Sequence, residues 1–221
     1  NALEGTAEMN IVPSRKVYDS TPPNPEGINE AASLLMTASR PIMMVGDRVS
    51  DDGAMEQAIE LAELMGLPVY QSRGAEAAFP TTHPQFLGNL SLRAADHREI
   101  LQRVDLVIAV GMGAFEELFY WGDVILKPET KLIHIDPIPG GVGKSEPTDV
   151  GIVSHCGLAM GALTAAIKPQ LLESDQTAIA NRAKAVVRES QESRDAFDQS
   201  VVEKWDSKPM TPARMMSELA A

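Results

Sequence analysis

Three glycines and one aspartate at the ends of apolar segments are the strongest candidates for ligand binding in this sequence. Gly111 and Gly113 follow one apolar run, Asp136 ends the next, and Gly46 ends an earlier one. Glycine lets the backbone approach a phosphate closely, and a carboxylate after a strand can accept a hydrogen bond from a ribose hydroxyl. We therefore expect a nucleotide-type crevice with the diphosphate near Gly111 and Gly113 and a ribose near Asp136.

The glycine pattern after residue 110 is only part of the dinucleotide-binding fingerprint Gly-x-Gly-x-x-Gly. Glu116 stands where the third glycine belongs, Glu117 adds a second negative charge, and no basic residue lies within several positions of Gly111. The alternative for Gly111 is a plain strand-to-loop turn, and the alternative for Asp136, which precedes a proline, is the start of a turn. We therefore expect FAD, ADP or CoA derivatives to bind weakly or not at all.

The segment 140–145 nearly matches a phosphate-binding loop, in which backbone amides and a following helix bind phosphate groups. Ile138 occupies the position of the leading glycine. Pro147 comes two residues after Ser145 in a stretch without apolar periodicity, so the required helix is not expected. The segment is predicted to be a glycine-rich connecting loop.

His155 and Cys156 are the residues nearest to a base and nucleophile pair. Adjacent residues of a helix point in different directions, so the two side chains cannot act on each other if both are helical. The remaining histidines, His83, His97 and His134, lack the spacing of metal ligands. We expect no catalytic residue and no metal site in this chain.

The composition narrows the classes of function. The 221 residues are 44% hydrophobic, enough for one large core, and the formal net charge of −12 argues against nucleic acid and anionic membrane surfaces as partners. The single cysteine excludes an intrachain disulfide, and no apolar run approaches the roughly 18 residues of a membrane helix. The chain begins at Asn1 without a leader, so it reads as a cytoplasmic chain cut from a longer one.

Apolar runs alternate with amphipathic segments along most of the chain. Strands are expected at residues 42–46, 67–70, 104–110, 131–136 and 150–153. Helices are expected at residues 26–38, 54–65, 96–103, 157–167 and, as one long and partly exposed helix, within 171–206. We expect Asp51 and Asp52 at the start of the second helix, Gly66 at its end, and a loop over residues 71–94. The alternation predicts a doubly wound, Rossmann-like α/β fold, with a mostly parallel sheet and helices on both faces.

These segments, in this order, resemble the central domain of thiamine-diphosphate-dependent 2-oxo acid enzymes, the superfamily of acetolactate synthase and benzoylformate decarboxylase. The resemblance covers about residues 5–168. The segments that carry it are residues 40–46, 67–69, 79–88, 105–111, 126–133, 135–137, 143–144 and 149–153.

The resemblance implies that the chain is divided into three segments, which belong to different domains. Residues 1–25 would be the end of a pyrimidine-binding domain, with a strand at 5–14 and a proline-rich linker. Residues 26–169 would be the central domain. Residues 170–221 would be a helical connector and the start of a pyrophosphate-binding domain, which residues 208–212 and 215–219 resemble.

The resemblance also implies that the chemistry lies outside this chain. In the family, the catalytic glutamate belongs to the pyrimidine-binding domain, and the Gly-Asp-Gly motif that holds magnesium and diphosphate belongs to the pyrophosphate-binding domain. We therefore expect a fragment of a decarboxylase (lyase) or carboligase (transferase). It would act as spacer, homo-oligomer contact and active-site wall, while thiamine diphosphate and Mg²⁺ bind only in the parent enzyme.

FAD is the remaining cofactor question. Flavin-containing relatives use a glycine-rich turn after the equivalent of Leu87-Gly88, where this chain has residues 89–93 without glycine. That difference favours the decarboxylase branch, which generally keeps this domain without a nucleotide. The alternative function is a free-standing module that binds FAD, ADP or CoA.

Overall fold

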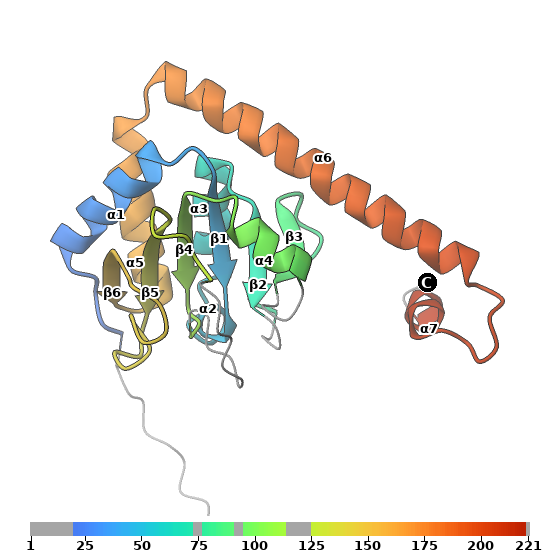
Figure 1. The fold of residues 1–221 in the computed structure, drawn as a ribbon. Helices are drawn as coiled ribbons and strands as arrows, with labels where there is room; N and C mark the ends of the chain where they lie inside the picture. The colour runs from blue at the N-terminus through green and yellow to red at the C-terminus, as the bar shows by residue number, and fades with distance from the viewer. Residues whose placement is uncertain (1–19, 73–76, 91–94, 114–124, 220–221) are drawn as a thin grey trace, which may run out of the picture.

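The computed structural model describes residues 20–72, 77–90, 95–113 and 125–219 (Figure 1). Its described strands form one sheet of six parallel strands in the order β3-β2-β1-β4-β5-β6. They are β1 (Pro41–Val45), β2 (Val69–Ser72), β3 (Phe86–Leu90), β4 (Leu106–Val110), β5 (Lys131–Asp136) and β6 (Val150–Val153). The strand order grows outward in both directions from β1, which confirms the doubly wound α/β fold.

Helices cover both faces of the sheet. On one face, α1 (Pro25–Thr37), α3 (Met55–Met65) and α5 (Cys156–Ile167) bury their apolar sides against strand residues such as Met43 and Val45. On the other face, α4 (Ala95–Leu101) lies over a smaller core that contains the alternate residues, such as Ile42 and Met44. Because successive strand residues point to opposite faces, a strand buried on both sides must be apolar throughout, as β1 and β4 are.

The ends of the predicted helices follow from local chemistry. The Asn24 side chain accepts a hydrogen bond from the Glu26 amide at 2.9 Å, and Pro25 occupies the first turn, so α1 begins there. Gly66 ends α3 with a φ of 61°, the left-handed conformation that glycine adopts without strain.

The sequence-based expectations differ from the structure at two elements. Residues 71–94 are not all loop, because β3 lies within them at the edge of the sheet. The short helix α2 (Asp47–Asp51) was also not expected, and Asp51 belongs to it. Asp52 lies between α2 and α3, and its carboxylate accepts a hydrogen bond from the Cys156 amide at the start of α5. The predicted strand at residues 5–14 lies outside the described residues.

The long helix α6 (Glu173–Glu203) follows the short 3₁₀ helix η1 (Lys168–Gln170) and precedes α7 (Pro212–Leu219). It extends across the amino edge of the sheet and beyond it (Figure 1). The Arg182 guanidinium donates to the Met65 carbonyl at 2.6 Å, and the Ser190 hydroxyl donates to the Phe86 carbonyl at 3.0 Å. Side chains of α6 thereby satisfy backbone carbonyls at the end of α3 and the start of β3. Within the described part of the chain, no helix is long and apolar enough to span a membrane.

Candidate functional site

The carboxyl edge of the sheet brings together three of the four candidate residues. The strand order reverses between β1 and β4, so Gly46 and Gly111, which follow these strands, flank the topological switch point. Asp136 ends β5, one strand further along. Asp136 therefore lies one strand away from the switch point, because β1, and not β5, is the neighbour of β4 at which the strand order reverses.

Gly46 and Gly111 permit a close approach between two backbone segments of this chain. The Gly46 amide donates to the Val110 carbonyl at 3.0 Å, and the Arg48 amide donates to the Gly111 carbonyl at 3.1 Å. A Cβ on Gly46 would lie 2.5 Å from the Met112 Cβ, and a Cβ on Gly111 would lie 2.7 Å from the Val49 nitrogen. The turn after β1 therefore packs directly onto the turn after β4, in the place where a ligand diphosphate would have to approach.

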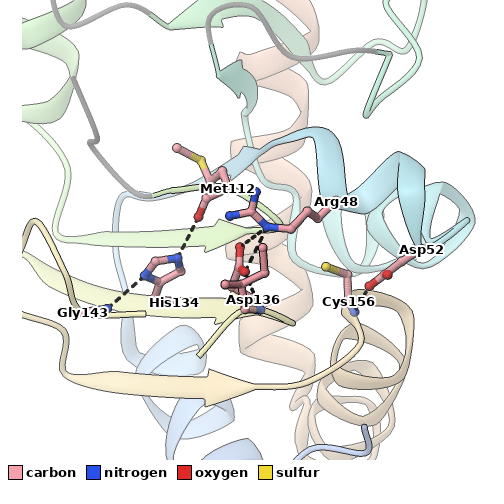
Figure 2. A network of polar contacts seen from close by, with 8 residues as sticks. Arg48, Asp52, Met112, His134, Asp136, Gly143 and Cys156 are labelled. Atoms are coloured by element: carbon pink, nitrogen blue, oxygen red, sulfur yellow. Dashed lines mark hydrogen bonds and ion pairs between the residues drawn. The ribbon is translucent and has the colours of Figure 1, made fainter. Parts of the chain in front are cut away.

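Asp136 forms a buried ion pair with Arg48 from α2 (Figure 2). The Arg48 Nε lies 3.0 Å and 2.9 Å from the two carboxylate oxygens, and the Ile138 amide donates to Oδ1 at 2.8 Å. Asp136 is fully buried, whereas the Arg48 side chain is 25% exposed. The carboxylate expected to bind a ribose hydroxyl is thus already bound by a guanidinium and a backbone amide of the chain itself.

Sequence reasoning missed Arg48, although its guanidinium pairs directly with the candidate residue Asp136. Arg48 lies 88 positions before Asp136 in the chain. A usable signal exists, since a basic residue directly after the first strand of a doubly wound sheet must lie near the carboxyl ends of the neighbouring strands.

His134 connects β5 to the glycine-rich loop that follows it. Its ring is buried, its Nε2 lies 2.8 Å from the Met112 carbonyl oxygen, and the Gly143 amide donates to its Nδ1 at 3.4 Å. With these partners, Nε2 is the donor and Nδ1 the acceptor. The loop between β5 and β6 folds back over the sheet, because a Cβ on Gly151 would meet Val142 at 2.7 Å. No helix follows Lys144 before β6, so the predicted connecting loop is present instead of a phosphate-binding loop.

Cys156 begins α5 and is fully buried beside Asp52. Its amide donates to the Asp52 carboxylate at 2.6 Å, while the His155 side chain accepts from the Gly157 amide as the N-cap. Burial, together with the negative charge of Asp52, raises the pKa of the Cys156 thiol well above its ordinary range. The thiol therefore stays protonated, and both His155 and Asp52 serve the start of the helix rather than a nucleophile.

The remaining candidates lie at the border of the described residues. Gly113 is half-buried and is the last described residue of its segment, and Glu116 and Glu117 lie outside the described residues. Among the residues that the structure describes, no group of three or more His, Cys, Asp and Glu side chains could hold a metal ion. The described site can hold strand ends together rigidly, but it offers no activated base or nucleophile.

Known proteins match this chain over the α/β domain described above. The model of the family described as "Thiamine pyrophosphate enzyme, central domain" matches residues 28–163, from α1 into α5. Acetolactate synthase from Mycobacterium bovis is 36% identical over 150 residues, which cover 67% of this chain and 24% of that protein. Sulfoacetaldehyde acetyltransferase from Roseovarius nubinhibens is 33% identical over 131 residues, or 58% of this chain and 22% of that protein. The chain spans about a quarter of the length of these curated relatives.

Solved structures show the same fold. The thiamine diphosphate-dependent 4-hydroxybenzoylformate decarboxylase from Rhodococcus jostii RHA1 superposes with a TM-score of 0.62 and 28% identity, over 71% of this chain and 30% of that one. Benzoylformate decarboxylase from Polynucleobacter necessarius superposes with a TM-score of 0.63 and 22% identity, over 73% of this chain and 30% of that one. With more than half of its length matched by the family model, this chain belongs to the central-domain family of thiamine pyrophosphate enzymes.

Proposed function

We propose that this chain is the central structural domain of a larger thiamine-diphosphate-dependent enzyme and has no catalytic residues of its own. It acts as a spacer, as a contact between subunits and as a wall of the active site. One observation carries the proposal: residues of the chain itself fill the carboxyl edge of the sheet. The Arg48–Asp136 pair and the packed turns at Gly46 and Gly111 take the positions that a bound nucleotide would need.

The relatives support a parent enzyme that makes or cleaves bonds next to a 2-oxo group, as a lyase or a transferase. Those named above are a synthase, an acetyltransferase and two decarboxylases. We propose that thiamine diphosphate and Mg²⁺ bind to the flanking domains of the parent, a cytoplasmic homo-oligomer, and that FAD and ADP are not bound here.

The proposed division into domains follows the match to the family. Residues 26–169 form the central domain, which contains the matched residues 28–163. Residues 170–221 form the connector to a pyrophosphate-binding domain, and residues 1–25 lead in from a pyrimidine-binding domain. Arg182 and Ser190 of α6 support this role, because their hydrogen bonds to backbone carbonyls hold the connector against the domain.

The proposal is tested by the response of the chain to nucleotides and to the cofactor. Thermal unfolding is measured with FAD, ADP or CoA at millimolar concentration, and titration calorimetry is run with thiamine diphosphate and Mg²⁺. A ligand present at 100 times its dissociation constant would stabilise the chain by about 2.7 kcal/mol. We expect no stabilisation by the nucleotides and no heat of cofactor binding.

A variant pair identifies the site if a nucleotide does bind. Gly113→Val changes the proposed diphosphate position, and Gly140→Val is the control because a Cβ at Gly140 has no atom within 4 Å. Stabilisation by FAD that disappears in Gly113→Val and persists in Gly140→Val would overturn the structural role. It would make the chain a flavin-binding domain.

A further inference from the structure

A cavity of about 610 Å³ lies at the amino edge of the sheet, opposite to the edge that carries Asp136. It lies between the amino ends of β1 and β2, the end of α4 and one side of α6. Its apolar lining includes Ile42, Tyr70, Leu87, Ile100 and Val104. This volume is within the range of small-molecule sites in proteins, about 300–1,000 Å³.

Three of the four charged residues that line this amino-edge cavity are cations. Arg40 before β1, Arg103 after α4 and Arg182 in α6 line it. The carboxylate of Glu189 lines it as well. Arg103 pairs with Glu99, and the Asp105 carboxylate lies near enough to Arg182 to oppose the lowering of its pKa by burial. With Glu189, these carboxylates match the three arginines in number. A guanidinium that no carboxylate pairs, beside a concave and partly apolar surface, still attracts an anion.

The three guanidinium groups differ in how far they are already engaged. Arg103 lies 3.0 Å from Glu99, and Arg182 donates to the Met65 carbonyl. The Arg40 side chain makes no hydrogen bond or ion pair with any residue that the structure describes, since only its backbone takes part in the bonds to Asp105. Arg40 is therefore the cation that a ligand can engage without breaking an existing contact.

Tyr70 supplies a second polar group to the cavity. The residue is only 6% exposed, and its hydroxyl makes no hydrogen bond to the described part of the chain. Burial, with a smaller effect from the Glu189 carboxylate, raises the pKa of Tyr70. The hydroxyl thus remains protonated and can donate to an acceptor on a ligand.

We infer that this amino-edge cavity is a second ligand site, which takes an organic anion with an apolar body, such as an aryl or medium-chain carboxylate. The carboxylate would lie between Arg40 and the Tyr70 hydroxyl, and the apolar body would cover Ile42 and Leu87. Arg40 is exposed and would supply a charge-assisted hydrogen bond, while the buried Tyr70 hydroxyl would supply one in a desolvated place, where hydrogen bonds are stronger than in water. The site is separate from the carboxyl edge and goes beyond the proposed structural role.

The inference is tested with a matched pair of probes on the 221-residue chain. 4-Phenylbutyrate carries the carboxylate, and 4-phenylbutan-1-ol has the same body without charge. Binding is followed by amide chemical shifts in ¹⁵N-labelled protein. We expect the carboxylate to bind at least about tenfold more tightly than the alcohol, with shift changes at Arg40, Ile42, Tyr70 and Leu87.

Variants test whether the Arg40 charge and the Tyr70 hydroxyl contribute to carboxylate binding. Arg40→Gln should weaken carboxylate binding about tenfold, and Tyr70→Phe should weaken it about threefold. Arg188→Gln is the control, because Arg188 lies exposed on α6, paired with Glu192 at 3.7 Å, and does not line the cavity. Either of two results would overturn the inference: equal binding of the alcohol and the carboxylate, or unchanged binding in Arg40→Gln. No binding at millimolar concentration, or shift changes confined to the carboxyl edge, would also overturn it.

Discussion

Replacing Gly111 with alanine should reveal how tightly the turns after β1 and β4 are packed. The new Cβ would lie 2.7 Å from the Val49 nitrogen and 3.0 Å from the Val49 Cγ2, and the residue would keep a φ of 63°. Gly53 is a matched control, since its φ is 61° but a Cβ there would have no atom within 4 Å. Both substitutions carry the cost of the left-handed conformation, and only Gly111→Ala also forces two backbone segments apart.

The expected losses of unfolding free energy follow from these contacts. Gly53→Ala should cost about 1 kcal/mol, the penalty for alanine in the left-handed region. Gly111→Ala should cost about 3 kcal/mol. To the same penalty it adds about 1 kcal/mol for overpacking and about 1 kcal/mol for weakening the hydrogen bond from the Arg48 amide to the Gly111 carbonyl.

Urea unfolding, followed by circular dichroism, measures the loss of unfolding free energy in each of the two variants. The slope of free energy against urea should stay constant, so that the midpoint alone reports stability. Equal losses for the two variants would refute the reasoning, because the close approach at Gly111 would then relax without cost.

Three further predictions concern the same edge of the sheet. Arg48→Met should lower the unfolding free energy by about 3 kcal/mol, because it leaves the buried Asp136 carboxylate without a counter-charge. Asp136→Asn should lower the unfolding free energy less, since the partly exposed Arg48 can turn toward water. A double-mutant cycle should show that the two substitutions are coupled, and additive losses would contradict a stabilising ion pair. Because the pKa of Cys156 is raised in the folded state, its contribution to stability is complete below the ordinary thiol pKa near 8.5 and declines as pH rises above it. The unfolding free energy should therefore fall by about 1 kcal/mol between roughly pH 8 and 9.5, and an unchanged slope in Cys156→Ala would refute this assignment. Lys144→Ala should leave any affinity for ATP unchanged, as measured by calorimetry, because no helix follows the glycine-rich loop; a large loss would restore the phosphate-loop interpretation.

Elements with strong local signals could be predicted from the sequence. The predicted strands at residues 131–136 and 150–153 have the observed bounds of β5 and β6, since both are short apolar runs with clear turn residues around them. The predicted helix at 54–65 matches α3 to within one residue, because its apolar period and the glycine after it are local properties.

Elements that depend on distant partners were missed. β3 contains Gly88 with a φ of 103° and the exposed Asn89, which weaken any strand pattern, and it is ordered by pairing with β2. An edge strand needs fewer apolar residues than a central one, so its sequence is less distinctive. The five residues of α2 are likewise too few to show an apolar period.

The candidate site divides in the same way. Glycines and an aspartate after apolar runs are visible in the sequence, because chain direction alone places the ends of parallel strands at one edge of the sheet. Which of these ends are neighbours depends on strand order, and strand order results from pairing between residues far apart in the chain. The pairing of β1 with β4 brings Gly46 onto Gly111, and α2 brings Arg48 onto Asp136. The sequence alone therefore showed which residue types stand at the strand ends. Only the tertiary structure showed that Arg48 already binds Asp136, since no local pattern encodes a contact between residues 88 positions apart.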